Sequence, residues 1–177
     1  MSQRRLRSPS THILLTTPVL FAGLLWIGHG CQQVYPLTVR MTAEGLIFTS
    51  TIIEQGLKEN KRYLLLNFGV TKIEPCDKPG GCGMWIIVRP YNLDNPDATM
   101  SLRPPNLLSL PIRYGQSFPN MEVTEGPVPL TPGRYDVSAG VSGSSDGIRF
   151  DFGLTFMHEF VIKKNAQGNL EVEAVRN

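Results

Sequence analysis

The stretch "IRFDFGLTFMHEFVI", residues 148–162, carries the strongest structural signal in the chain. Apolar side chains alternate here with polar or small ones, which is the period of a β-strand with one buried face. These 15 residues at about 3.3 Å each would form a strand of roughly 50 Å, longer than strands usually run. We therefore expect a bend at Gly153 or near His158. The side chains expected to face inward are Ile148, Phe150, Phe152, Leu154, Phe156, His158, Phe160 and Ile162.

The same period of two continues on both sides of this stretch. In "LTPGRYDVSAGV", residues 130–141, a Pro-Gly turn is followed by Tyr135, Val137 and Ala139 at alternate positions. Residues 63–73 alternate similarly, and residues 84–88 form a continuous apolar run of the kind found in strands buried on both faces. The chain ends in a predicted hairpin that turns at residues 165–169.

These strands predict an all-β fold. The 14 prolines and 17 glycines, mostly between the predicted strands, suit an antiparallel β-sandwich of about eight strands. Residues 49–60, "TSTIIEQGLKEN", fit either a helix capped by Ser50 or Thr51 or a strand and a turn. We expect a single domain over residues 31–177.

The first 30 residues resemble no part of this pattern. Residues 1–12 form a polar segment with a net positive charge, and the apolar run of residues 13–27 follows it. Gly28-His29-Gly30 then places small residues at alternate positions. This order predicts a secretory signal peptide over residues 1–30. An uncleaved membrane anchor is the alternative, although a helix over the apolar run would span only about 22 Å of a hydrocarbon core of about 30 Å.

The residues at the predicted cleavage site resemble the lipobox of bacterial lipoproteins. In this chain the motif is Gly30-Cys31, after a basic stretch and a short apolar run. The resemblance implies cleavage before Cys31 and a lipid on its side chain that attaches the mature protein to a membrane. Gly28 and His29 depart from the lipobox, which takes an aliphatic residue and a small uncharged residue at these positions. Cleavage without lipidation is the alternative.

The chain from Cys31 onward also resembles the small β-sandwich lipoproteins of the bacterial envelope, through the context of Cys31 and the stretch 130–141. In that family, an Asp directly after the lipidated Cys resembles a signal for retention in the inner membrane. This chain has Gln32 at that position. The resemblance therefore implies the outer membrane, on its periplasmic side. A soluble periplasmic or secreted protein is the alternative.

The charge distribution argues against nucleic acid as a partner. Arg4, Arg5 and Arg7 account for three of the 17 Lys and Arg residues, and all 15 Asp and Glu residues lie beyond residue 43. The predicted mature chain therefore holds 14 basic and 15 acidic residues. It retains no basic stripe of the kind that binds a phosphate backbone.

The three cysteines are read together. If Cys31 carries a lipid, Cys76 and Cys82 remain as a pair, with Pro79-Gly80-Gly81 between them to reverse the chain. A disulfide over so short a loop removes about 2 kcal/mol of unfolded-chain freedom. A zinc site would need four ligands, and only one histidine follows residue 31. The sequence predicts neither a metal site nor a cofactor.

No set of catalytic residues is recognisable. "GSSDG", residues 143–147, has the G-x-S-x-G pattern of a nucleophile elbow with Ser145 as nucleophile, but a predicted strand follows it where the elbow requires a helix. We therefore predict a hairpin turn here. His158 lies on the apolar face of its predicted strand, as a core or rim residue. Asp136, Asp151 and Glu159 show no spacing typical of a hydrolytic pair.

The candidate binding residues lie in and beside a Pro-rich stretch, residues 92–106. Long loops on a rigid sandwich often form its binding site. Tyr91, Asp94 and Asp97 are our candidates. The aspartates and Asn95 could supply oxygen ligands for calcium, but an Asx turn before Pro96 explains them as well.

Two functions follow as expectations. The first is a non-enzymatic lipoprotein of the cell envelope that binds or assembles with a protein partner. The second is a secreted carbohydrate-binding domain, with or without hydrolysis, that uses Tyr91 and the loop containing Asp94 and Asp97.

Overall fold

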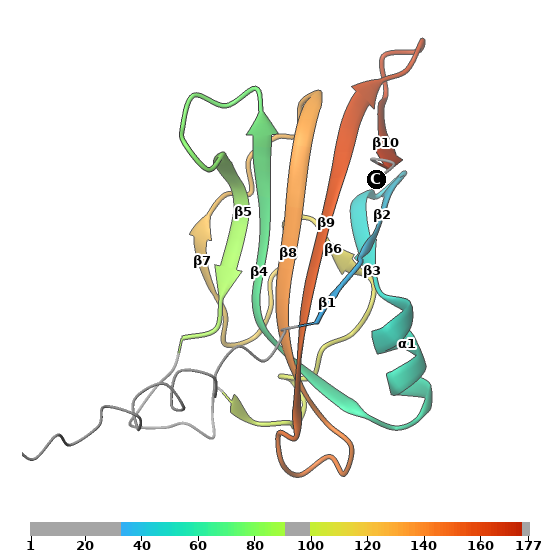
Figure 1. The fold of residues 1–177 in the computed structure, drawn as a ribbon, viewed down its shortest axis with the longest axis vertical. Coiled ribbons are helices and arrows are strands. Elements are labelled where there is room, and N and C mark those ends of the chain that lie inside the picture. The colour runs from blue at the N-terminus through green and yellow to red at the C-terminus, as the bar shows by residue number, and fades with distance from the viewer. Residues whose placement is uncertain (1–32, 91–99, 175–177) are drawn as a thin grey trace, which may run out of the picture. The chain divides into compact units, whose positions relative to one another are not determined.

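A computed structural model describes residues 33–90 and 100–174. Cys31, Tyr91, Asp94 and Asp97 therefore lie outside the described residues. The described part contains ten strands and one α-helix, so the predicted all-β class is confirmed. The strands form two sheets, one of seven strands and one of three (Figure 1).

The larger sheet has the order β1-β9-β8-β4-β5-β7, and β10 also pairs with β9. All its pairs are antiparallel except that of β1 with β9. Its strands are β1 (Val34–Tyr35), β4 (Arg62–Glu74), β5 (Cys82–Val88), β7 (Glu122–Glu125), β8 (Gly133–Ser144), β9 (Phe152–Lys164) and β10 (Leu170–Ala174).

The smaller sheet has the antiparallel order β2-β3-β6. Its strands are β2 (Thr38–Thr42), β3 (Gly45–Thr49) and β6 (Ile112–Arg113). Helix α1 (Thr51–Lys58) follows β3 directly and resolves the ambiguity of residues 49–60 in favour of a helix. Ser50 caps it, because its side chain accepts a hydrogen bond of 3.4 Å from the backbone N–H of Ile53. With 8 residues, α1 is too short to cross a membrane, and no other helix of the described residues could do so.

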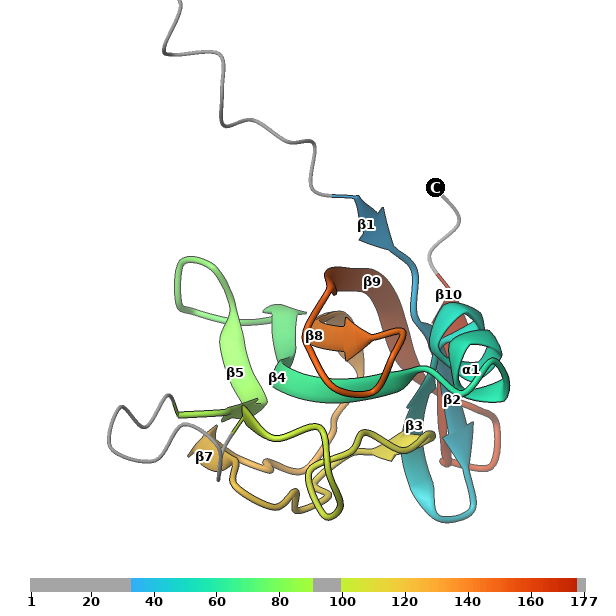
Figure 2. The same ribbon diagram turned by 90° about the horizontal axis from the view of Figure 1, so that it is seen from below.

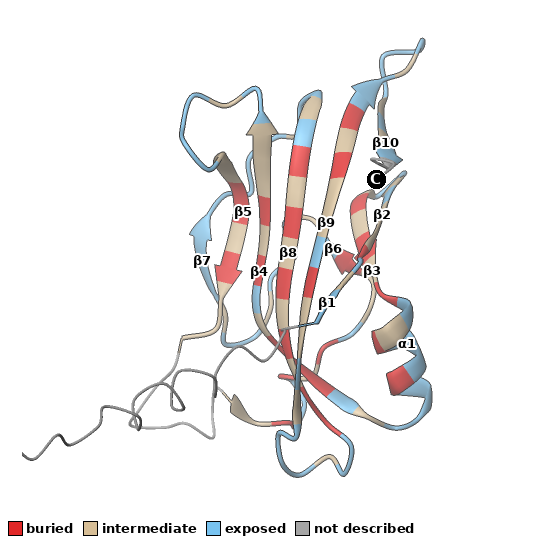
Figure 3. Ribbon diagram, in the orientation of Figure 1, coloured by how far each residue is buried: buried red, intermediate tan, exposed pale blue. Residues whose placement is uncertain are grey.

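The alternation that predicted β9 is present in the structure (Figure 3). Phe156, Phe160 and Ile162 are buried, whereas Met157 and Lys163 between and after them are exposed. The expected strand start was wrong, however. β9 begins at Phe152, so Ile148 and Phe150 belong to the preceding turn and are exposed. From Phe152 onward β9 is one continuous strand.

The two sheets share one hydrophobic core. Phe48 of β3 packs against Phe68 of β4 and Phe160 of β9, with ring centroids 5.0 and 6.4 Å apart. Seen from below, β3 and β6 lie across from β4 and β8 (Figure 2). The inward faces of both sheets therefore supply the buried surface that stabilises the fold.

Candidate functional site

The outer edge of the seven-stranded sheet is interrupted. β1 pairs with β9 at Thr155 and Phe156, and β10 pairs with it from Phe160 to Lys164. No described strand pairs with residues 157–159 on that side. Successive residues of a strand point their backbone N–H and C=O groups to opposite sides. At least one residue of this segment therefore presents both groups to the open side.

A hollow of about 530 Å³ lies at this interruption. We call it the Asp136 hollow. Its walls come from β1 and the residue after it, from β8, and from the open segment of β9. The lining residues are Val34, Tyr35, Pro36, Arg134, Asp136, Met157, His158 and Glu159.

Two carboxylates face each other across strands in this hollow. Asp136 of β8 lies directly opposite Glu159 of β9 in the antiparallel register. Side chains in such positions start about 5 Å apart. Arg134 binds Glu159 through two hydrogen bonds, of 3.1 Å from Nε and 2.5 Å from Nη2 to Oε2. Among the described residues, none forms a salt bridge with Asp136.

The environment of Asp136 disfavours its ionised form. Partial burial raises the pKa of its carboxyl, and the negative charge of Glu159 raises it further. The backbone N–H of Val137 and the side chain of His158 offset part of this increase. The pKa of Arg134 is raised, because its hydrogen bond to Glu159 favours the charged guanidinium. The hollow thus contains a carboxylate that is partly desolvated and forms no salt bridge with any described residue.

His158 occupies the rim of the core. Its cross-strand neighbour is Val137, which is fully buried, while His158 is half-buried and lines the hollow. The predicted core or rim position is therefore a rim position.

The turn that contains Ser145 is confirmed as a hairpin between β8 and β9. The Oγ of Ser145 donates a short hydrogen bond to Asp151, and Asp146 accepts hydrogen bonds from Ser144 and from the backbone of Ile148 and Arg149. The hydrogen bonds that Asp146 accepts lower its pKa to about 2, and the backbone N–H of Ile148 makes the largest contribution. Strand β9, not a helix, follows Ser145, so the nucleophile-elbow geometry is not formed.

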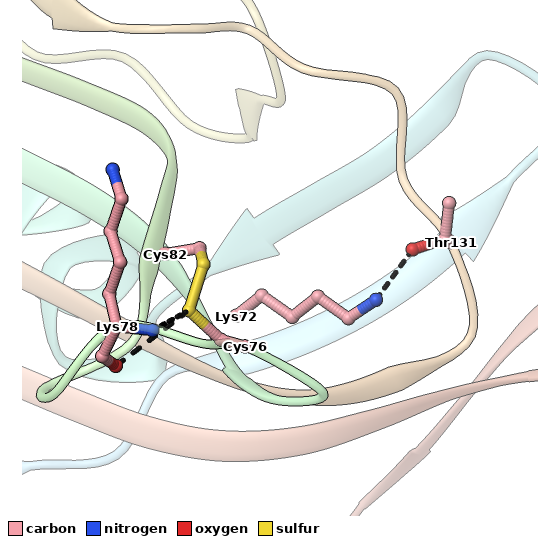
Figure 4. Close-up of a disulfide and its surroundings, with 5 residues drawn as sticks. All are labelled: Lys72, Cys76, Lys78, Cys82 and Thr131. Atoms are coloured by element: carbon pink, nitrogen blue, oxygen red, sulfur yellow. Dashed lines mark hydrogen bonds between the residues drawn. A yellow bond between two sulfur atoms is a disulfide. The ribbon is translucent and has the colours of Figure 1, made fainter.

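The predicted disulfide between Cys76 and Cys82 is present, with Cα atoms 5.8 Å apart. It closes the connection between β4 and β5 (Figure 4). The backbone N–H of Lys78 lies 3.3 Å from Cys76 Sγ within this loop. Lys72, at the end of β4, donates a hydrogen bond of 2.7 Å to Thr131 and so connects this end of β4 to the segment before β8.

A second hollow, of about 420 Å³, lies between α1 and the start of β9. Tyr63 of β4 and Phe152 of β9 form its apolar wall, and their rings pack edge to face with centroids 5.8 Å apart. Gln55, Glu59 and Lys61 form its polar rim. No three His, Cys, Asp or Glu residues in the described part of the chain are grouped to hold a metal ion.

Sequence reasoning missed the pairing of Asp136 with Glu159. The predicted hairpin could have indicated this pair, because the register that places Gly143 opposite Phe152 also places Asp136 opposite Glu159. Extending the strand back to Ile148 concealed that register. Comparisons of the chain with known protein families, with curated proteins and with solved structures found no match, so its functional assignment rests on its own residues.

Proposed function

We propose that this protein is a non-enzymatic binding module of the bacterial cell envelope that holds a protein partner at the Asp136 hollow. The observation that carries the proposal is the partly desolvated carboxylate of Asp136, without a salt bridge to any described residue, beside an interrupted sheet edge. A lysine or arginine of a partner would restore the charge balance of this carboxylate.

An extended segment is the partner structure that fits best. The open side of residues 157–159 presents backbone groups that a short extended peptide can pair with, as in binding by strand addition. Arg134 is already bound to Glu159 and so leaves Asp136 as the anionic group for the partner. The backbone contacts supply affinity, and the carboxylate selects a cationic side chain.

Export of the chain is supported by its covalent chemistry. Disulfides persist in oxidising compartments such as the periplasm, and Cys76 and Cys82 form one. With these two paired, Cys31 is left as the third cysteine and as the proposed lipid-bearing first residue of the mature protein. We place the protein at the outer membrane, on its periplasmic side.

The location is tested by intact mass spectrometry of the protein after expression in a bacterium with a functional export pathway. We expect a mass without residues 1–30, with added lipid on Cys31, and with two hydrogens missing for the disulfide. A mass that retains residues 1–30 would refute the lipoprotein assignment.

We regard the domain as an unequal β-sandwich, with the three-stranded sheet packed on the inward face of the larger one. The hydroxyl of Tyr135, near the start of β8, donates a hydrogen bond of 2.6 Å to the carbonyl of Thr131. A tyrosine that bonds back to the backbone at the start of a strand is a feature of β-sandwich corners. This supports a sandwich with loops available for binding.

The partner hypothesis is tested by affinity purification from detergent-solubilised envelopes. We expect Asp136→Asn to lower recovery of the bound protein about tenfold or more, because its cationic group loses its counter-charge. Asp77→Asn is the matched control, since Asp77 lies in the disulfide loop, away from the hollow. Recovery of the bait alone, or equal recovery with both variants, would refute binding at this hollow.

A second candidate, carbohydrate binding with hydrolysis, is favoured by one observation. Asp136 has a raised pKa, as a general acid requires, and lies opposite the Arg134-bound carboxylate of Glu159. Tyr35 adds an aromatic wall. Loss of a glycan signal on an array in both Tyr35→Ala and Asp136→Asn would support this function. Absence of any glycan signal for the wild-type protein would eliminate it.

A further inference from the structure

The turn between β8 and β9 presents apolar side chains to solvent. Ile148 is 78% exposed and Phe150 39% exposed, and the cationic Arg149 between them is exposed as well. We call residues 148–150 the hairpin tip. Large exposed apolar side chains that gather at one site mark contact surfaces rather than ordinary protein surface.

The polar groups of the turn are occupied within it. Asp146 accepts hydrogen bonds from the backbone N–H groups of Ile148 and Arg149, at 2.8 and 3.1 Å, and from Ser144. Asp151 accepts hydrogen bonds from the hydroxyl and the backbone N–H of Ser145. These bonds hold the hairpin tip in a defined conformation, so its apolar side chains need no refolding to enter an apolar phase.

The topology places the first described strand, β1, toward the same end of the domain. β1 runs parallel to β9, with Val34 opposite Thr155, three residues after β9 begins at Phe152. β1 therefore begins beside the part of β9 that follows the hairpin tip. Cys31 precedes Val34 by three residues, which limits their separation to about 10 Å.

We propose that the hairpin tip inserts Ile148 and Phe150 into the lipid surface that carries the Cys31 anchor, so that two points hold the domain on the membrane. This inference rests on the proposed lipidation of Cys31. Stable attachment to a membrane commonly requires a second contact besides a lipid chain. The short tether between Cys31 and the domain keeps the tip at high local concentration near the bilayer. Arg149 is placed to contact lipid phosphates.

A tryptophan at the tip tests this contact. The lipidated, exported protein with Ile148→Trp is reconstituted into vesicles of phosphatidylethanolamine and phosphatidylglycerol that contain brominated lipid. We expect a blue-shifted emission and about a twofold loss of intensity, because the indole enters the interface. Trp85 is 1% exposed and supplies a constant background.

Val123→Trp is the matched control. Val123 is 55% exposed on β7, at the opposite edge of the seven-stranded sheet from β9 and β1. Its replacement indole should remain in water and escape quenching. Equal quenching of both probes would overturn the proposal, since it would show unspecific contact with lipid.

Mass spectrometry of the same sample separates this inference from the lipoprotein assignment. A lipid on Cys31 together with an unquenched indole in the Ile148→Trp variant would overturn the tip contact and leave the anchor intact. Quenching of that indole in a protein without the lipid would support the tip contact and refute the anchor. If the tip indole leaves water only when an envelope protein is added, the tip is a protein-binding site and the membrane proposal is wrong.

Discussion

At the scale of single residues, the hydroxyl of Tyr63 explains why position 56 is a glycine. Tyr63 is 2% exposed and extends beneath helix α1, and a Cβ atom on Gly56 would overlap the Tyr63 oxygen and lie 2.7 Å from its Cζ. The helix can approach β4 only because Gly56 has no side chain. Burial also raises the pKa of the Tyr63 phenol.

Gly56→Ala should therefore destabilise the protein. Helix propensity alone would predict a gain of about 1 kcal/mol, but the overlap with Tyr63 should cost roughly 1–3 kcal/mol in the free energy of unfolding. Chemical denaturation measures the difference. The double variant Gly56→Ala/Tyr63→Phe should recover part of the loss, whereas the surface control Gln55→Ala should change stability by less than about 0.5 kcal/mol. A stabilised Gly56→Ala would contradict this packing.

The raised pKa of Asp136 predicts how the free energy of unfolding depends on pH. Its pKa is raised in the folded state, so its protonated form favours folding and its ionised form opposes it. At pH 7, Asp136→Asn should raise the free energy of unfolding by about 0.5 kcal/mol or less, because water still screens a half-exposed carboxylate. The difference should shrink as the pH falls through the raised pKa of Asp136, where the wild-type side chain becomes protonated. Denaturation curves at pH 7 and at acidic pH test this, and a constant difference would argue against the raised pKa.

At the scale of elements, β9 divides its residues between core and surface with a period of two. Phe160 is fully buried and stacks on Tyr135 with ring centroids 5.5 Å apart. Met157, three residues earlier, is 48% exposed. The strand is thus held by one face, and its other face is free to line the Asp136 hollow.

Two truncations on this strand should differ sharply. Phe160→Ala should lower the free energy of unfolding by about 3–5 kcal/mol, because it leaves a cavity among aromatic rings. Met157→Ala should change it by less than about 0.5 kcal/mol. Thermal unfolding followed by circular dichroism compares them, and similar losses would contradict the assigned faces of β9.

The disulfide stabilises the loop between β4 and β5 and does not hold the two sheets together. The bridge joins two residues that are six positions apart in the sequence and lie outside the core. Its removal by the paired substitution Cys76→Ser/Cys82→Ser should therefore cost about 2 kcal/mol. The sheets should remain folded. Thermal unfolding measures the cost, with the wild-type protein under reducing conditions as the comparison. A variant that no longer folds would show that this loop organises the fold.

At the scale of the whole molecule, Tyr114 connects the two sheets. Its backbone N–H donates to Leu46 of β3, and its hydroxyl lies 2.8 Å from the carbonyl of Met84 in β5 and 2.7 Å from that of Val128. The ring packs against Trp85. One residue therefore holds the smaller sheet, the larger sheet and the segment before β8 together, through its backbone N–H and its side chain.

Tyr114→Phe should remove the hydroxyl's hydrogen bonds to Met84 and Val128 while keeping the ring and the backbone bond to Leu46. We expect a loss of about 1–2 kcal/mol in the free energy of unfolding, since the carbonyls of Met84 and Val128 lose the one O–H donor that they share. Tyr35→Phe serves as the control. Burial raises the pKa of Tyr114 to about 12, so the wild-type protein should lose stability between pH of about 10 and 12, and the variant should lose less. Identical alkaline profiles would contradict the raised pKa of this partly buried hydroxyl.

Part of the candidate site was predictable from the sequence and part was not. The hairpin turn at Ser145 followed from its Gly, Ser and Asp residues, which favour turns. The alternation, however, continued through Ile148 and Phe150, although the hydrogen bonds of Asp146 hold this segment in the turn. The register, and with it the pair of Asp136 and Glu159, was therefore missed.

The sequence by itself determined the strand-rich class, the inward face of β9 from Phe152 onward and the closure of the Cys76–Cys82 loop. Periodicity and turn residues are local, and neighbouring residues decide them. Only the tertiary structure decided that β1 and β10 leave a break on the edge of β9, and that Tyr114 reaches Met84. These features depend on contacts between residues far apart in the chain, and no local pattern encodes such contacts.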